Sequence, residues 1–537
     1  MLMTTTSKAR YVLGAVVALA ALFGSRTAGA AYDWLQFNGD SRHSGNNTHE
    51  VLLSAANVAS LNRRFQVTLP SSADGAPVVL TGVATAVGTR DLLFLTTKAA
   101  HILALDAATG VTVWSHQNGP GSCHINNGSS ACFTTSSPAV DPTRKHVFSY
   151  GLEGKVHQYQ VGDGSEITTG GWPQLVTNKP FDEKVSGALA VATAADGVSY
   201  LYVGTGGYPG DRGNYQGHVT VIRLSDGVQR VFNGVCSNQT VHFAEPPATP
   251  NCASVQSAVW ARAGVIYDSD VDKVFFGTGN GDYQPANHHW GDSILAVNPD
   301  GTGNASGDPL DVYTPASFAT LDSADLDLGS TAPAILAVPA SSKIRHLGLQ
   351  GGKDALLRLL DLDNLSGKDG PGHTGGEVGG SFAVPQGGRV LSAPATWTNP
   401  ADGSSWVFVG NDNGLAGLWV SVDGAGNPSL VTAWMKAVPA TSPLVANGVL
   451  YVASQNQVLA LSPTTGGQLA AVSSGGIHWQ SPVVANGTVY IADENQRLTA
   501  YNAPAPASVP AMSGSVSLAT ALLLLAAGVR HLSRRRE

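Results

Sequence analysis

The chain has 537 residues, of which 13% are charged, 63 are glycine and four are cysteine, and its formal net charge is −8. An acidic chain with so little charge offers no basic face to nucleic acid, so we expect no nucleic-acid partner. The abundant glycine suits many tight turns between short strands, which favours an all-β fold.

The first 30 residues predict a secretory signal peptide. Lys8 and Arg10 precede an apolar run from Tyr11 to Phe23, and the small residues of a cleavage site follow at 28–30. No cysteine stands after that site to carry a lipid anchor. We therefore expect an exported protein, located in the periplasm or at the cell surface.

Residues 31–502 consist of a repeated unit. Small residues followed by proline open apolar strands, as in "TSPLVANG" at Pro443 and "QSPVVANG" at Pro482, and Gly, Asn and Asp then end the strands as in antiparallel β-meanders. Units begin near residues 77, 138, 188, 259, 333, 394, 443 and 482. Small sheets of this kind protect their edges by packing radially, so the repeats predict one eight-bladed β-propeller of four-stranded antiparallel blades.

The last unit, which begins near residue 482, is one strand short. The segment "RFQVTLP" at 64–70 is the strand that could complete it. We therefore expect the ring to close by pairing this N-terminal strand with the C-terminal repeat.

The four cysteines form two local pairs, Cys123 with Cys132 and Cys236 with Cys252. In an oxidising compartment two short-range disulfides are expected, although four cysteines allow three pairings. Their spacings fit neither a zinc site nor a CxxCH haem attachment, so we expect no covalent haem.

The chain ends outside the repeats. A Pro/Ala/Ser-rich linker spans 503–512, and 513–537 holds a short apolar helix, from Val516 to Val529, with an arginine-rich tail. The helix is marginal for a bilayer, which takes ~17–25 residues, but the tail would hold that end on the cytoplasmic side. Two interpretations remain open: a C-terminal sorting signal of an exported surface protein, and a plain tail anchor in the membrane.

One repeat, "ALDAATGVTVW" at 104–114, resembles the blade motif of the quinoprotein dehydrogenases, propellers that hold pyrroloquinoline quinone (PQQ). In that family the tryptophan packs one blade against the next. The opening "YDWLQFNGDSRHSGNN" at 32–47 also resembles the first segment of these propellers. The same blades build non-catalytic scaffolds, including an outer-membrane-protein assembly factor, so the site must decide the chemistry.

The resemblance implies a calcium ion held by Asn280 and Asp327. "FFGTGN" ends at Asn280 and is similar to a family turn whose asparagine oxygen binds calcium, a metal that favours oxygen ligands. The plain alternative is an asparagine that tolerates a tight turn. "GGYPGDRGNYQGHVTVI" resembles the segment with the family's metal-binding glutamate, but its nearest carboxylate is Asp211, a weak substitute.

Three further residues match family positions in the same order along the chain. Trp260 stands where the family tryptophan stacks on the quinone, Asp327 in "DLDLGSTAP" where the catalytic base stands, and Lys353 in "GGKDA" where a lysine contacts the quinone oxygens. Taken singly, these would be a core aromatic, a turn residue and a solvated lysine.

Asp325 leaves a second assignment open. We expect Asp325 and Asp327 on one face of a strand, where two close carboxylates repel unless a cation lies between them or one keeps a proton. Lanthanide-using relatives carry an extra Asp two residues after the base, which would make Asp325 the base and Asp327 a ligand. The "STAP" register favours Asp327 as base and calcium as metal.

Two functions follow from these observations. The first is an exported PQQ-dependent dehydrogenase that oxidises a small-molecule or polymer alcohol and passes electrons to a separate acceptor. The second is a non-catalytic propeller scaffold that binds protein or glycan at the cell surface. The adjacent histidines of "NHHWGD" at 287–292 are interpreted as plain surface, and His218, His242 and His478 have no metal-ligand spacing.

Overall fold

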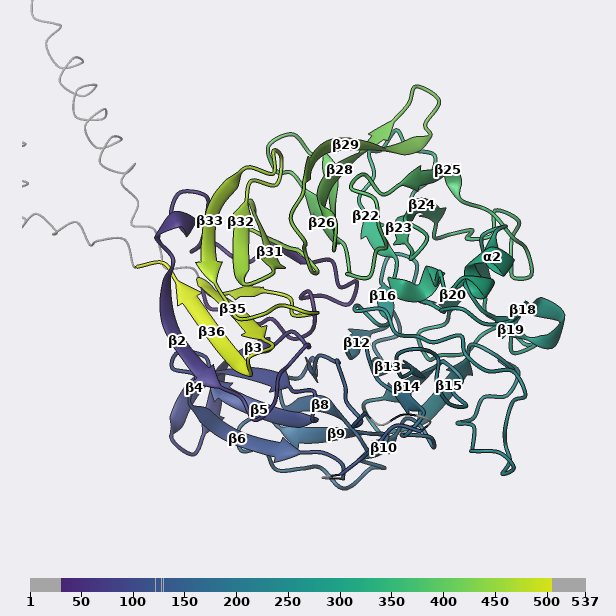
Figure 1. The fold of residues 1–537 in the computed structure, drawn as a ribbon, viewed down its shortest axis with the longest axis horizontal. Coiled ribbons are helices and arrows are strands. Elements are labelled where there is room, and N and C mark those ends of the chain that lie inside the picture. The colour runs from purple at the N-terminus through teal and green to yellow at the C-terminus, as the bar shows by residue number, and fades with distance from the viewer. Residues whose placement is uncertain (1–29, 121, 127, 129, 505–537) are drawn as a thin grey trace, which may run out of the picture.

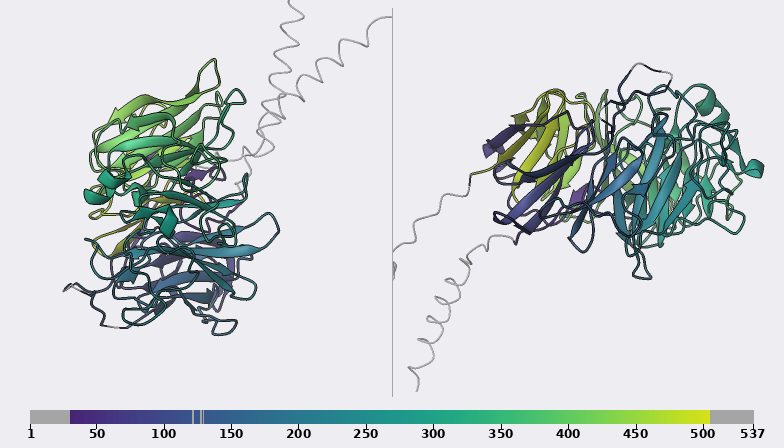
Figure 2. Two further views of the ribbon diagram at one scale, coloured as in Figure 1. Left: turned by 90° about the vertical axis from the view of Figure 1, so that its right-hand side faces the viewer. Right: turned by 90° about the horizontal axis from the view of Figure 1, so that it is seen from below.

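The computed structural model describes residues 30–504, apart from residues 121, 127 and 129. These residues form eight sheets arranged as blades around an axis, and the ring is thinner along that axis than across it (Figure 1, Figure 2). The predicted all-β, eight-bladed propeller of four-stranded antiparallel blades is confirmed. The predicted signal peptide and C-terminal apolar helix lie outside the described residues.

In each blade the first strand lies nearest the axis and the last lies at the rim (Figure 1). The first four blades are β3 (Val78–Thr85), β4 (Gly88–Thr96), β5 (His101–Asp106) and β6 (Thr112–Gln117); β7 (Ala139–Val140), β8 (His146–Gly151), β9 (Lys155–Gln160) and β10 (Gln174–Leu175); β12 (Ala190–Thr193), β13 (Ser199–Gly207), β14 (His218–Arg223) and β15 (Gln229–Asn233); and β16 (Ile266–Asp268), β17 (Lys273–Gly277), β20 (Ile294–Val297) and β21 (Asp311–Tyr313).

The remaining blades follow the same order. They are β22 (Ala334–Leu336), β23 (Leu347–Gly351), β24 (Leu356–Asp361) and β25 (Val378–Ala383); β26 (Ala395–Thr398), β27 (Ser405–Asn411), β28 (Gly414–Val422) and β29 (Pro428–Lys436); β30 (Leu444–Ala446), β31 (Val449–Ser454), β32 (Gln457–Leu461) and β33 (Gln468–Ser473); and β34 (Val483–Ala485), β35 (Thr488–Asp493), β36 (Arg497–Asn502) and β2 (Asn62–Thr68).

Short elements decorate the ring. They are β1 (Asn46–Asn47), β11 (Glu183–Lys184), the hairpin β18 (Tyr283–Gln284) and β19 (His289–Trp290), the helix α2 (Phe318–Ser323), and the 3₁₀ turns η1 (Val58–Ser60), η2 (Pro285–Asn287) and η3 (Leu328–Ser330). Within the described part of the chain, no helix has the length and apolar character needed to cross a membrane.

The hydrophobic core lies between neighbouring blades. Each blade is covered on both faces, so central strands such as β27 and β31 are buried along their whole length. Trp114, the tryptophan of the repeat motif, packs at 5.8 Å from the ring of Tyr159 in the next blade and donates a hydrogen bond to the Val161 carbonyl (2.9 Å). Blade-to-blade packing by this tryptophan, expected from the motif, is therefore present.

The ring closes as the sequence predicts. β2 pairs antiparallel with β36, from Asn62 opposite Asn502 to Thr68 opposite Arg497, and thereby adds an N-terminal outer strand to the last blade. In Figure 1 the purple strand β2 lies beside the yellow strand β36. A sheet made from both ends of the chain has no open edge at the seam.

The segment before β2 crosses the middle of the ring and bonds to several blades (Figure 1). His43 Nδ1 lies 2.6 Å from the Ala263 carbonyl, the Ser44 carbonyl accepts the N–H of Thr396, and the Gly45 carbonyl accepts the N–H of Val445. Phe37 in this segment is completely buried. The opening segment therefore ties blades from opposite sides of the ring together.

Buried polar groups fix this segment to the last blade. Asn47 is 2% exposed; its amide nitrogen donates to the Tyr32 hydroxyl (2.9 Å) and the Val484 carbonyl (2.7 Å), and its oxygen accepts the N–H of Glu50 (3.1 Å). Glu50 in turn accepts hydrogen bonds from the Tyr32 hydroxyl (2.8 Å) and the Gly487 N–H (3.0 Å).

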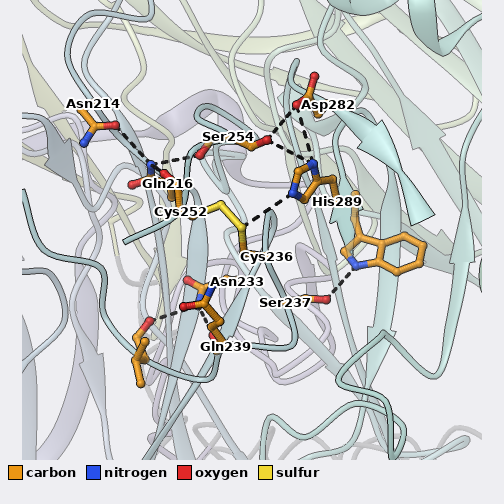
Figure 3. The surroundings of a disulfide bond; sticks show 12 residues. Asn214, Gln216, Asn233, Cys236, Ser237, Gln239, Cys252, Ser254, Asp282 and His289 are labelled. Atoms are coloured by element: carbon orange, nitrogen blue, oxygen red, sulfur yellow. Dashed lines mark hydrogen bonds and ion pairs between the residues drawn. A yellow bond between two sulfur atoms is a disulfide. The ribbon is translucent and has the colours of Figure 1, made fainter. Parts of the chain in front are cut away.

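Both predicted local disulfides are present, Cys123–Cys132 and Cys236–Cys252. The second lies beside His289, whose Nε2 is 3.7 Å from Cys236 Sγ and whose Nδ1 bonds to Ser254 Oγ (3.1 Å) (Figure 3). Because both sulfurs are in the disulfide, this Cys/Cys/His cluster has no thiolate to offer a metal ion.

The expectation that the adjacent histidines of "NHHWGD" are plain surface is wrong for His289, which is buried. His289 and Trp290 form β19, and Trp290 is 1% exposed with its indole N–H on Ser237 Oγ (2.9 Å). Cys236, Ser237 and Ser254, at the Cys236–Cys252 disulfide, contact the two side chains (Figure 3), which a local sequence pattern does not reveal. His288 remains partly exposed and pairs with Asp308.

Asn47→Ala should lower the free energy of unfolding by on the order of 2–3 kcal/mol, because it leaves buried hydrogen-bonding groups on two segments of the seam without a partner. Asn62→Ala, in an exposed position of the same N-terminal region, should change it by less than about 0.5 kcal/mol. Urea denaturation of the two variants and the parent measures both values. Equal effects would mean that the polar cluster does not hold the ring closed.

Candidate functional site

Near the axis of the ring lies a cavity of about 360 Å³, within the size range of small-ligand sites, about 300–1,000 Å³. Its walls come from loops of several blades and carry aromatic, cationic and acidic side chains. The lining includes Phe133, Lys184, Tyr208, Asp211, Tyr215, Trp260, Arg262, Asp325, Asp327, Lys353, His478 and Trp479. Four of the five residues proposed from the sequence therefore line one cavity, and the fifth, Asn280, contacts two of them.

Asn280 lies between the two carboxylates. Its backbone N–H donates to Asp327 Oδ1 (3.1 Å), and its side-chain nitrogen lies 3.3 Å from Asp211 Oδ2. The residue is 6% exposed. Asp211 is held from the other side by the hydroxyl of the buried Tyr215, at 2.5 Å from Oδ1. Asn280 is thus more than a strand-end turn residue: it joins residues that are 69 and 47 positions away.

Close backbone packing brings Asp327 to Asn280. Gly329, two residues after Asp327, donates its N–H to the Thr278 carbonyl (3.0 Å), two residues before Asn280. A Cβ at position 329 would lie 2.4 Å from that carbonyl, so only glycine permits this approach. The glycine in "DLDLGSTAP" therefore positions the carboxylate, a role that the sequence pattern did not reveal.

Asp327 accepts hydrogen bonds from three sides. Trp260 Nε1 and Lys353 Nζ each lie 3.0 Å from Oδ2, and the Asn280 N–H contacts Oδ1. Burial raises the pKa of Asp327, against the opposing effect of the Lys353 ammonium. The Trp260 ring also faces Lys353, whose Nζ is 5.3 Å from the ring centroid.

Lys353 lies between the two aspartates of the motif. Its Nζ is 2.5 Å from Asp325 Oδ1 as well as 3.0 Å from Asp327 Oδ2. Burial acts to lower the pKa of Lys353, but the two carboxylates outweigh it and the pKa is raised. The repulsion expected between the aspartates is thus relieved by this cation, which the sequence had placed at the site for another reason.

The prediction that Asp325 and Asp327 lie on one face of a strand is wrong. Asp325 follows α2 in the left-handed region (φ 52°), and Asp327 immediately precedes η3. Local partners satisfy this backbone: the N–H of Leu326 bonds to the Leu321 carbonyl and that of Leu328 to Asp292 Oδ1. With these donors already bonded, the segment has no strand ladder to join until β22.

Asp292 is a buried acid behind the site that sequence reasoning missed. It is 1% exposed; Oδ1 accepts the Leu328 N–H (3.0 Å), whereas Oδ2 has no partner among the described residues. Burial raises the pKa of Asp292 to about 8, against the opposing Leu328 N–H and with a smaller contribution from Asp327. At neutral pH this carboxyl is therefore protonated.

Two further buried cations that line the cavity, Arg262 and Lys184, were also missed by sequence reasoning. Arg262 donates to the carbonyls of Thr135 and Asp74 (2.7 Å each), and its buried Nε has no partner in the described structure. Lys184 bonds to the Ser186 hydroxyl. Across the described residues neither cation is paired with a carboxylate oxygen. A charged residue inside the apolar runs "VWARAGVIY" and "EKVSGALAV" was the available signal.

His478 and Trp479 complete the cavity from the last blade. Asp74, whose side chain is fully buried, lies 3.2 Å from His478 Nδ1 and 3.2 Å from Lys98 Nζ. Burial alone would raise the pKa of Asp74, but the hydrogen bond from His478 and the charge of Lys98 outweigh it and hold the pKa at about 2. The sequence showed no metal-ligand spacing around His478. In the structure this residue lies at the cavity beside the ionised carboxylate of Asp74.

The chemistry of these donors fits an anionic ligand and a hard metal ion. Arg262 Nε and Lys184 lack anionic partners, as a site for carboxylates requires. The oxygens of Asp211, Asn280 and Asp327 are ligands that calcium accepts, although calcium takes about 6–8 oxygens and would need others from ligand or water. PQQ with calcium is therefore compatible with this cavity.

Asp292→Asn should make stability less dependent on pH. The native state keeps a proton on Asp292 that the unfolded chain releases above its ordinary pKa of 3.8. The parent should thus lose stability as pH rises from about 4 to about 8, where Asp292 ionises in both states, and level off above that. The melting temperature of Asp292→Asn minus that of the parent should therefore increase as the pH is raised from about 5 to about 8.

Asn at position 292 keeps the oxygen that accepts the Leu328 N–H, so the comparison isolates the ionisation. Asp412→Asn, in an exposed turn, is the control and should follow the parent at every pH. A constant difference between Asp292→Asn and the parent across this range would contradict a protonated Asp292.

Comparison with known proteins places the fold. Residues 45–170 and 373–505 match the family model described as outer membrane protein assembly factor BamB. No curated protein matches the sequence. One similar solved structure is a quinohemoprotein alcohol dehydrogenase from Pseudomonas putida HK5, with a TM-score of 0.57 and 15% identity over 90% of this chain and 84% of that chain. A europium-containing methanol dehydrogenase has a TM-score of 0.59 and 14% identity over 89% of this chain and 98% of that chain. A quinohemoprotein alcohol dehydrogenase from Comamonas testosteroni has a TM-score of 0.56 and 16% identity over 92% of this chain and 83% of that chain.

Identities near 15% show a shared fold and leave the activity to be argued from residues. The repeats, the eight blades closed by an N-terminal strand and the match of two stretches to a family of such repeats agree with one another. The chain therefore has the fold of the PQQ-type β-propellers, and two stretches of it match a family model of such repeats.

Proposed function

We propose that the protein is an exported PQQ-dependent quinoprotein dehydrogenase that oxidises the hydroxyl group of a small-molecule or polymer alcohol. The observation that carries this proposal is that Trp260, Asn280 and Lys353 all contact the carboxylate of Asp327, at the wall of one cavity. Each has a plain explanation on its own. Their meeting around one carboxylate, in a ring whose similar structures are alcohol dehydrogenases, favours a shared role.

The chain offers two walls for a flat tri-acid such as PQQ. Arg262 and Lys184 would receive carboxylates, and the Trp260 ring would support the planar system. Asp211, Asn280 and Asp327 would hold calcium, with the Asn280 amide turned so that its oxygen faces the ion. Bound there, PQQ would supply the two-electron acceptor for hydride from the alcohol carbon.

The residues around that space are arranged for proton transfer. Asp327 is proposed as the base that takes the alcohol proton, and its raised pKa brings it nearer to the pH at which bases work well. Lys353 keeps its charge, because its pKa is raised, and would stabilise negative charge that develops beside it. Trp260 fixes the carboxylate by donating to Oδ2.

A second candidate is a non-catalytic scaffold that binds protein or glycan at the cell surface. The stretches that match the assembly-factor family leave out residues 171–372, and all five proposed site residues lie in that part. The missing family glutamate, with Asp211 in its place, also favours this candidate. The scaffold would use the blades alone and leave the cavity without a cofactor.

Location and partners remain proposals that depend on the sequence. Two disulfides support an oxidising compartment, in keeping with an exported protein in the periplasm or at the cell surface. No CxxCH occurs in the sequence, so an enzyme of this kind would pass electrons to a separate acceptor. Membrane attachment through the C-terminal helix stays a prediction, because that helix lies outside the described residues.

The purified chain should bind PQQ with calcium saturably, seen as a change in quinone absorbance and a higher melting temperature. Arg262→Met and Lys184→Met should each weaken binding by at least about tenfold, because each removes a buried cation from the carboxylate wall. Lys145→Ala, an exposed cation outside the cavity, should bind as the parent does. No saturable binding to the parent would leave the scaffold as the function.

Asp327→Asn should lower kcat for alcohol oxidation in the PQQ- and calcium-loaded protein by at least about 100-fold, the scale of a lost general base. Asp325→Asn should change kcat less than about tenfold, since Asp325 is largely exposed and only contacts Lys353. Reduction of an artificial dye acceptor with a series of primary alcohols measures both. The reverse order of effects would make Asp325 the base and Asp327 a metal ligand.

A further inference from the structure

Lys184 is a buried amine on the wall of the cavity with no acid of its own. It is 4% exposed, and its Nζ bonds to the Ser186 hydroxyl. Glu183, its neighbour on β11, pairs with Lys179 at 2.9 Å instead, because adjacent side chains on a strand point to opposite faces. Among the described residues, no carboxylate therefore forms an ion pair with the Lys184 ammonium, and Asp74 acts on it only from a distance.

Aromatic rings, whose faces attract an ammonium only weakly, make up much of the rest of its surroundings. Nζ lies 4.7 Å from the centre of the Phe133 ring and 5.8 Å from that of Tyr208. Burial lowers the pKa of Lys184 to about 7; Arg262 and Lys98 add to this effect, and Asp74 opposes it. About half of the chains would then carry a neutral amine here at neutral pH, against almost none for an ordinary lysine.

We propose that Lys184 is a nucleophilic amine that condenses with carbonyl compounds bearing a carboxylate, and that Arg262 attracts that carboxylate. The neutral amine attacks the carbonyl carbon, the carbonyl oxygen leaves as water, and a C=N bond joins Nζ to the ligand. No net oxidation occurs, and no co-reactant is needed. Asp325 and His478, more than half exposed, also line the cavity, so small molecules can reach it from solvent.

Lys353 provides an internal control within the same cavity. Its Nζ contacts Asp325 and Asp327, and its pKa is raised rather than lowered. A carbonyl compound that enters the cavity meets both lysines, but only Lys184 offers a neutral amine. Selective reaction at Lys184 would thus report the electrostatic environment and not simple access.

The test uses the full chain without PQQ, treated with glyoxylate and sodium borohydride, which reduces the imine to a stable secondary amine. Peptide mass spectrometry should find the adduct on Lys184 and not on Lys353, and its rate should rise with pH to a plateau with a midpoint near 7. Lys184→Met should lose the adduct. Equal labelling of Lys353 or Lys145, or a midpoint near the ordinary value of 10.5, would overturn the proposal.

Acetaldehyde, which has no carboxylate, tests the part assigned to Arg262. Glyoxylate should react with Lys184 at least about tenfold faster than acetaldehyde after correction for their rates with Lys145, and Arg262→Met should remove that advantage. If Arg262→Met does not fold, excess acetate serves instead. It should slow the reaction of Lys184 with glyoxylate and leave its rate of reaction with acetaldehyde unchanged. Equal corrected rates would contradict anion recognition. Because PQQ is absent, labelling can succeed or fail independently of cofactor binding.

Discussion

Closure of the ring is the constraint on which the rest of the structure depends. Eight sheets can surround an axis only if the last one meets the first, and here the join is made by β2 from the N-terminus pairing with β36 from the C-terminus. The segment before β2 then crosses the middle and bonds to blades on several sides. Loops that are far apart in the sequence face one another because this join holds the circle at a fixed size.

The cavity is a product of that geometry. Its charged groups, among them Arg262, Lys184, Asp211 and Asp327, come from segments of different blades. Burial lowers the pKa of Lys184, whereas at Lys353 the two carboxylates outweigh burial and raise the pKa. One lysine has two carboxylates and the other has none, and this difference separates a charge-stabilising role from a nucleophilic one.

The match to the repeat family and the candidate chemistry occupy different parts of the chain. Residues 45–170 and 373–505 supply regular blades, whereas the part between them carries the hairpin β18–β19, the Cys236–Cys252 loop, α2 and all five proposed site residues. Regular blades bury their faces against neighbours, so their sequence is limited by packing. The longer loops are less restricted in this way, and they carry the polar residues around the cavity.

The sequence by itself determined the class of fold, because local signals repeat: several blades open on small residues and a proline, and strands end on turn residues. It also indicated the closing strand, since the last unit is one strand short and "RFQVTLP" at 64–70 could complete it, and the order of Trp260, Asn280, Asp327 and Lys353. The tertiary structure decided what no local pattern carries. Packing of Gly329 on Thr278 set the place of Asp327, and the meeting of several blades left Arg262 and Lys184 without acids. Such facts depend on distances between segments that only the closed ring fixes.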